Sequence, residues 1–425
     1  MKRTICFIMV AMVCMTGPVF AGTIELPQTG QTTCYDLYGS PINCPGTGQD
    51  GDIQAGVAWP SPRFTVNTGT VVDNLTGLVW AKDGNIMPTR NPGWDTDYPL
   101  NDGTVAFHNA LDYVTKLNDE VYLGHSDWRL PNVNEMKSLI NANEPHNDVW
   151  LNSQGFINVV HGAYWASTTD AGDTRRAWVV DMGDNNGYVD DFGDKPGSCL
   201  VWPVRSGQFD NAAICLPQTG QTLCYGTFGD YDVIPCSGTG QDGDTQAGIA
   251  WPSPRFTDNG DTVTDNLTSL MWTKNANLPG DHKTWQDALD YVKGMNNGTN
   301  PNFGHQDWHL PNRNEIYSLT DFSQYNPALP AGHPFTNVQL GSYWSSTTDA
   351  LHTSDAWYVY MPSGVLGFTS KQFSYDPCFV WPVRTGQAVP TGCSTWTEVI
   401  NKYTAYVNGQ ATWADVISCY GEYAQ

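Results

Sequence analysis

The pattern of apolar and polar residues predicts two helices followed by strands, and it does so twice along the chain. In the second half, four residues at helical spacing form one apolar face behind Thr284, a favourable N-cap: Trp285, Ala288, Leu289 and Val292. A second helix is expected after each pair with capping-box spacing, which are Asn132 with Glu135 and Asn312 with Glu315.

The strands are expected downstream of these helices. Alternation of Trp178, Val180 and Met182 is typical of a half-buried sheet. The predicted strands are 164–168, 177–182 and 200–205, then 343–347, 356–361 and 379–384. The rest is rich in Gly, Asn, Asp and Pro and is expected to be loop. The pattern therefore predicts an α+β fold with two helices and a small, mostly antiparallel sheet per unit.

The C-terminal segment 388–425 has a different pattern. Two amphipathic runs begin at Thr395 and Thr412, each with a capping residue, and Asn408-Gly409 lies between them. This arrangement predicts a helical hairpin. Its apolar stripe would pack either on the second unit or on another protein, because isolated short helices are marginal in water.

The chain repeats itself. The matching motifs are LPQTGQTTC at 26–34 and LPQTGQTLC at 216–224, GTGQDGD at 46–52 and 238–244, DWRLPN at 127–132 and DWHLPN at 307–312, and VWPVR at 201–205 and 380–384. Two units are therefore expected at 22–209 and 210–387. Each is long enough for an independent core.

The first 21 residues are typical of an export signal. Lys2 and Arg3 precede the apolar stretch 5–15, and Ala21 ends a small-residue cleavage motif. No later apolar run is long enough to span a bilayer. We therefore expect an exported protein without a membrane span, at the cell surface or in the medium, with the periplasm left open.

Nine cysteines follow the signal, and an oxidising compartment favours disulfides. Matching positions in the two units predict four pairs: Cys34 with Cys44, Cys224 with Cys236, Cys199 with Cys215, and Cys378 with Cys393. Cys419 remains without a counterpart. It is either reduced or joined to another chain, which would give a homo-oligomer through the tail.

The charge excludes one class of partner. Twenty Lys and Arg stand against 43 Asp and Glu, for a net charge of −23. Nucleic-acid binding depends on basic residues that displace counterions, so no nucleic acid is expected.

Both units contain the same ordered motifs: GTGQDGD, WPSPRF, DNLT, ALDYV, DW-x-LPN, YW-x-STTDA and VWPVR. In these motifs each unit resembles the Lcl C-terminal domain family. The resemblance implies a C-type-lectin-like fold related to the formylglycine-generating-enzyme core, and exported or surface binding proteins. The adhesin member of the family binds sulfated glycans. This chain lacks a collagen-like stretch and is acidic, which is unfavourable for a sulfated partner.

Clustered carboxylates give one candidate site. Calcium prefers several carboxylate and carbonyl oxygens, and Asp-Gly-Asp occurs in both units. The candidate ligands are Asp50, Asp52, Asp242, Asp244, Asp258, Asp261 and Asp265. Ordinary Asp-Gly turns are the alternative interpretation.

The segment between the last strands differs most between the units, and related lectin-like folds present ligand surfaces there. The candidate recognition residues are Asp184, Asn186, Tyr188, Asp190 and Asp191, then Tyr360, Phe368, Lys371 and Tyr375. A solvated hairpin is the alternative.

The functional hypothesis is a non-enzymatic adhesion protein that binds an extracellular glycan or a surface protein. His125 and His305 each lie two residues before an Asp, but no nucleophile stands in a recognisable catalytic arrangement. The alternative hypothesis is a structural subunit of a surface layer or appendage, assembled through the tail and Cys419.

Overall fold

The computed structural model describes residues 24–94, 102–183, 187–207, 212–372 and 378–385. The first copy contains β1 (Cys34–Tyr35), β2 (Pro41–Ile42), α1 (Asp50–Ile53), β3 (Phe64–Val66), β4 (Thr70–Asp73), β5 (Val79–Ala81), α2 (Ile86–Arg90), β6 (Thr104–Val105), α3 (Phe107–Asp119), the 3₁₀ turn η1 (Tyr122–Gly124), α4 (Val133–Ser138), α5 (Asn147–Ser153), β7 (Ala163–Thr169), β8 (Arg176–Asp181), β9 (Val189–Asp194), β10 (Cys199–Leu200) and β11 (Val204–Arg205).

The second copy repeats this order with fewer helices. It contains β12 (Cys224–Tyr225), β13 (Val233–Ile234), α6 (Asp242–Thr245), β14 (Phe256–Asp258), β15 (Thr262–Asp265), β16 (Leu270–Thr273), α7 (Trp285–Asn296), α8 (Arg313–Tyr317), β17 (Ser342–Thr348), β18 (Asp355–Tyr360), β19 (Val365–Ser370), β20 (Cys378–Phe379) and β21 (Val383–Thr385).

The expected helices are present, with the caps that the sequence indicates. Thr284 accepts a hydrogen bond from the Asp287 amide at the start of α7, and Trp285 and Leu289 are buried. Both α4 and α8 begin with a complete capping box, from Asn132 and Asn312. Each capping box satisfies backbone donors that a helix start leaves open.

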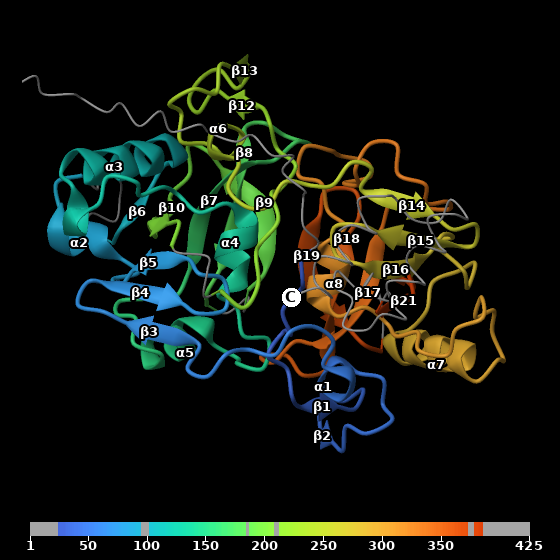
Figure 1. The fold of residues 1–425 in the computed structure, drawn as a ribbon. Coiled ribbons are helices and arrows are strands. Elements are labelled where there is room, and N and C mark those ends of the chain that lie inside the picture. The colour runs from blue at the N-terminus through green and yellow to red at the C-terminus, as the bar shows by residue number, and fades with distance from the viewer. Residues whose placement is uncertain (1–23, 95–101, 184–186, 208–211, 373–377, 386–425) are drawn as a thin grey trace, which may run out of the picture.

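One nine-stranded sheet runs through both copies, in the order β20-β17-β18-β19-β9-β8-β7-β10-β6. The copies meet where β9 pairs antiparallel with β19, with Val189 opposite Leu366. Each copy also has a four-stranded sheet, β11-β5-β4-β3 and β14-β15-β16-β21. Figure 1 shows the two halves side by side, with β9 and β19 facing each other at the middle.

The hydrophobic core is shared as well. One continuous cluster of buried residues includes Trp80 and Trp202 from the first copy and Trp272 and Trp381 from the second. Across the junction, the rings of Trp178 and Phe322 lie 5.0 Å apart, edge to face. The expectation of an independent core in each unit is therefore wrong, because one buried cluster extends across both copies and β9 of the first pairs with β19 of the second.

The predicted α+β fold class is also wrong. The protein is mostly β, with 25% strand against 17% helix, five sheets and eight short α-helices in the described residues. These sheets replace the expected C-type-lectin-like unit of two helices and one small sheet. Short strands such as 64–66 and 79–81 lie in segments that their Gly and Pro content had assigned to loops. The expected helical hairpin at 388–425 lies outside the described residues.

The two copies exchange their N-terminal segments. Residues 24–57 dock on the second copy, and residues 214–249 dock on the first; we call them the exchanged segments. The Ile24 amide donates to the Leu267 carbonyl, and the Ile214 amide donates to the Leu75 carbonyl. In Figure 1, α1, β1 and β2 lie below the orange second copy, whereas α6, β12 and β13 lie above the first.

Buried polar side chains fix this exchange. The Asp50 carboxylate accepts hydrogen bonds from Thr29 of its own segment at 2.7 Å and from Thr347 of β17 at 2.6 Å. The Gln31 amide pairs with both backbone groups of Thr348, at 2.7 and 2.9 Å. It thereby replaces a neighbouring strand where the register of β17 is irregular.

Residues 214–249 make equivalent contacts with the first copy. Asp242 accepts hydrogen bonds from Thr219 of its own segment and Thr168 of β7, both at 2.7 Å. Gln221 pairs with both backbone groups of Thr169. Neither half can satisfy these polar groups without the other.

The exchange predicts that the halves stay together after the chain is cut. A protease site inserted between residues 207 and 212 and then cleaved should give two fragments that co-elute at the size of the intact protein. The measurement is size-exclusion chromatography of the cleaved protein. Separate elution of two folded halves would contradict the shared sheet.

The buried carboxylates predict a characteristic pH dependence. Burial raises the pKa of Asp50 and Asp242 from 3.8 to about 6, with the threonine hydroxyls opposing the shift. The folded state therefore binds these protons more tightly than the unfolded state, so stability falls as pH rises from about 4 to 6. The loss is on the order of 3 kcal/mol per carboxylate.

The double variant Asp50→Asn/Asp242→Asn should lose this part of the pH dependence, because asparagine keeps an oxygen acceptor but does not titrate. Urea unfolding at pH 4, 5, 6 and 7 measures the free energy of unfolding and therefore its dependence on pH. The exposed variant Asp281→Asn is the control. An unchanged slope in the double variant would show that these carboxylates do not titrate as described.

Candidate functional site

Each exchanged segment carries a loop closed by a disulfide. Cys34 is bonded to Cys44 and Cys224 to Cys236, with Cα–Cα distances of 5.2 and 5.1 Å. We call these loop 34–44 and loop 224–236. Both predicted pairs are confirmed.

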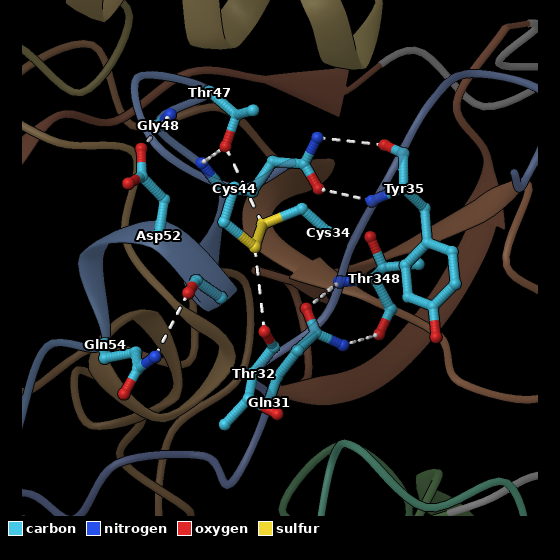
Figure 2. Close-up of a disulfide and its surroundings, with 12 residues drawn as sticks. Gln31, Thr32, Cys34, Tyr35, Cys44, Thr47, Gly48, Asp52, Gln54 and Thr348 are labelled. Carbon is cyan, nitrogen blue, oxygen red and sulfur yellow. Dashed lines mark hydrogen bonds between the residues drawn. A yellow bond between two sulfur atoms is a disulfide. The ribbon is translucent and has the colours of Figure 1, made fainter. Parts of the chain in front are cut away.

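The base of loop 34–44 is held by side-chain amides (Figure 2). Gln49 accepts from the Tyr35 amide at 3.0 Å and donates to the Tyr35 carbonyl at 2.9 Å. The Asp52 carboxylate accepts from the Gly48 amide at 2.9 Å. Gln241 and Tyr225 make the same pair of bonds in the second loop. The disulfide and these bonds together constrain the base of each loop.

A buried lysine of the opposite copy holds each loop from below. Lys371 Nζ donates to the carbonyls of Thr353 at 2.9 Å and Asp36 at 3.4 Å, and lies 4.5 Å from the Trp285 ring centre. Lys195 Nζ donates to the Gly226 carbonyl at 3.2 Å. Burial lowers the pKa of both lysines to about 7.

The loops present aromatic side chains to solvent. Tyr38 is 78% exposed and Phe228 is 72% exposed, and both stand four residues after the first cysteine of their loop. A glycine with positive φ follows each, Gly39 at 84° and Gly229 at 74°, a conformation that favours glycine. Exposed aliphatic residues lie nearby in each loop, Ile42 and Val233.

The family model of the Lcl C-terminal domain matches residues 69–205 and 261–384, which together exceed half of the chain. This chain belongs to the Lcl C-terminal domain family. Membership suggests an extracellular or surface protein. Both exchanged segments, with their closed loops, lie outside the matched ranges.

Among curated proteins, no match was found. Within the described residues, no helix has the length and apolar character needed to cross a membrane.

Within the Lcl C-terminal domains, several predicted recognition residues lie at the junction of the copies. Tyr188 packs edge to face against Phe368, with ring centres 6.1 Å apart. Asp190 is opposite Val179 in the sheet, and Lys371 is buried beneath loop 34–44. Tyr360 is exposed at the end of β18.

The other predicted recognition residues are described less fully. Asp191 lies in β9. Asp184, Asn186 and Tyr375 lie outside the described residues. Among the described positions, Tyr188 and Lys371 do not lie on one exposed surface with Tyr360, and the role of all nine in recognition stays a prediction.

The predicted calcium ligands are dispersed. Asp50 and Asp242 are buried between threonines, and Asp52 and Asp244 accept hydrogen bonds from the Gly48 and Gly240 amides. In the family-matched part, Asp258 pairs with Lys274 and Asp265 with Arg255, whereas Asp261 is exposed. In the described ranges, no group of three or more His, Cys, Asp or Glu is arranged to hold a metal ion. Calcium binding at these positions stays a prediction.

Of the other two predicted cysteine pairs, one is not formed and one lies partly outside the described residues. Cys199 and Cys215 are not bridged to each other in the described structure, so this expected disulfide is not formed. Cys199 starts β10, and burial raises its thiol pKa to about 12. Cys378 is buried at the start of β20. Cys393 and Cys419 lie outside the described residues, so the predicted pair with Cys378 and assembly through the tail stay predictions.

The aspartates beside His125 and His305 form ion pairs with arginine. Asp127 accepts two hydrogen bonds from Arg205, and Asp307 accepts two from Arg384. These bonds tie the DW-x-LPN motif to the VWPVR motif within each copy. The arginines lower the pKa of both carboxyls, and the geometry is that of a structural link.

Sequence reasoning missed Tyr38 and Phe228 as candidate binding residues. A signal was present, because a bulky aromatic followed by glycine stands at the same place inside both predicted disulfide loops.

Proposed function

We propose that this protein is an exported, non-catalytic binding protein that holds a protein partner through loop 34–44 and loop 224–236. The single observation that carries the proposal is the pair of exposed aromatics, Tyr38 and Phe228, on two loops that disulfides and buried lysines keep rigid. A rigid aromatic loses little entropy on binding, which is why such residues form the energetic centre of many interfaces.

The chemistry of the loops favours a protein over a glycan. The exposed neighbours of the aromatics are aliphatic, Ile42 in one loop and Val233 and Leu223 in or beside the other. Aliphatic and aromatic residues together match the apolar centre of a protein interface. A sugar needs several hydrogen-bonding groups beside the stacking ring. The net charge of −23 favours a neutral or basic partner surface.

The position of the loops supports bivalent binding. Figure 1 shows β1 and β2 at one end of the molecule and β12 and β13 at the opposite end. Two weak contacts at opposite ends of a rigid body can engage a repeated surface with high avidity. This geometry suits attachment to a surface that carries many copies of a partner.

The proposal predicts that loss of the aromatics removes binding. Tyr38→Ser/Phe228→Ser should bind immobilised extracellular matrix proteins at least about tenfold more weakly than the wild type, because central aromatics of an interface are its hot spots. Each single variant should lose mainly avidity. Surface plasmon resonance at low and high density of the immobilised protein separates the two effects.

Leu340→Ser is the matched control, since Leu340 is also a large apolar residue that is mostly exposed, at 59%, but lies outside both loops. It should bind like the wild type. Binding to a glycan array that depends on Tyr38 and Phe228, without binding to any protein, would replace the protein partner with a sugar. Binding that survives the double variant would overturn the role of the loops.

A further inference from the structure

A small cavity lies at the junction of the two copies, away from both loops. Its volume is about 50 Å³, room for a few water-sized groups. Equivalent residues of the two copies line it in pairs: Leu26 with Leu216, Pro27 with Pro217, Asn134 with Asn314, and Ser138 with Ser318. The cavity therefore lies where the repeat relates one copy to the other.

At two positions where the sequences of the copies differ, one copy brings a basic side chain to the lining. Lys137 stands where the second copy has Tyr317, and Arg313 stands where the first copy has Val133. Lys137, Arg313 and Tyr317 all line the cavity. Two basic side chains thus meet at the junction of the copies, in a protein with a strong negative charge.

Burial lowers the pKa of Arg313 to about 10, and the carboxylates of Asp349 and Asp50 oppose that shift from a distance. Within the described residues, no Asp or Glu oxygen lies within 4.0 Å of Lys137 Nζ or the Arg313 guanidinium. Lys137 Nζ donates to Asn314 Oδ1 at 2.7 Å, and Arg313 Nη2 donates to the Gly187 carbonyl at 2.6 Å. Arg313 also stacks 3.8 Å from the Trp357 ring centre.

Two buried donors at the cavity have no hydrogen-bond partner. These are Arg313 Nη1 and the Tyr317 hydroxyl, on side chains that are only 2% and 3% exposed. An unpaired buried donor is costly, and a ligand with oxygen acceptors would satisfy both; a negatively charged one would also interact favourably with Arg313. Burial lowers the pKa of Lys137, and the nearby Arg313 charge adds to this shift.

We propose that this cavity binds a small organic carboxylate. The carboxylate would accept from Arg313, Tyr317 and Lys137, and its short apolar chain would contact Leu26, Ile140 and Leu216 of the cavity wall. Arginine suits a carboxylate because its planar donors match the two oxygens. The proposal goes beyond the loop-mediated function, because it concerns a different part of the molecule and a small ligand.

The test is isothermal titration calorimetry of the full mature chain with butyrate, with butyramide as the uncharged analogue of the same shape. Butyrate should bind saturably in the millimolar range or below, and butyramide should not. Arg313→Val and Lys137→Tyr give each position the residue of the other copy. Each should weaken butyrate binding at least about tenfold, the loss expected for a charged hydrogen bond.

Lys293→Met is the control variant, because Lys293 is exposed on α7; it should bind butyrate like the wild type. Absence of saturable butyrate binding, equal binding of butyramide, or full binding by the Arg313→Val/Lys137→Tyr double variant would overturn the proposal. Equal displacement of butyrate by chloride would overturn the organic carboxylate class.

If the variants fail to fold, a measurement on the wild-type protein tests whether butyrate binds in this cavity. Reductive methylation of Lys137, followed by mass spectrometry, should slow in the presence of butyrate, with Lys293 as the internal reference. Unchanged methylation of Lys137 at saturating butyrate would overturn the proposal.

Discussion

Two buried carboxylates hold this molecule together. Asp50 and Asp242 each sit between a threonine of their own segment and a threonine of the opposite copy. A buried carboxylate is tolerated only where hydrogen-bond donors surround it, so each exchanged segment has to be docked for the site to be satisfied. The closed loops extend from those same segments. Their rigid presentation therefore depends on contacts between the copies rather than within one.

Strand pairing at the junction of the copies protects two sheet edges that would otherwise be exposed. Without its partner, β9 or β19 would be the exposed edge of a sheet, with open backbone donors and acceptors. Pairing β9 with β19 turns two edges into an interior. Tyr188 and Phe368 cover the same junction, which explains why the segment around them differs between the copies. The two segments pack against each other, which requires complementary shapes rather than identical sequences.

Local features could be predicted from the sequence, and long-range pairing could not. Capping boxes at Asn132 and Asn312 and the disulfide at Cys34 depend on residues close in the chain. Which copy receives residues 24–57 depends on a choice between Thr168 and Thr347, two identical residues in matching motifs. The position of Lys371 could not be predicted either, because lysine is usually exposed, whereas here the carbonyls of Asp36 and Thr353 and the ring of Trp285 lie around its Nζ.

The exchange of segments also bears on how such a protein could arise. If a chain with a single copy docked its segment in the same way, the donor threonine would come from a second molecule, and the product would be a two-fold symmetric dimer with swapped arms. Joining both halves in one polypeptide makes that association independent of dilution. It also frees the halves to diverge, as Val133 and Arg313 have done at equivalent places. A symmetric pair of identical chains could never carry a single charge on one side of its axis alone.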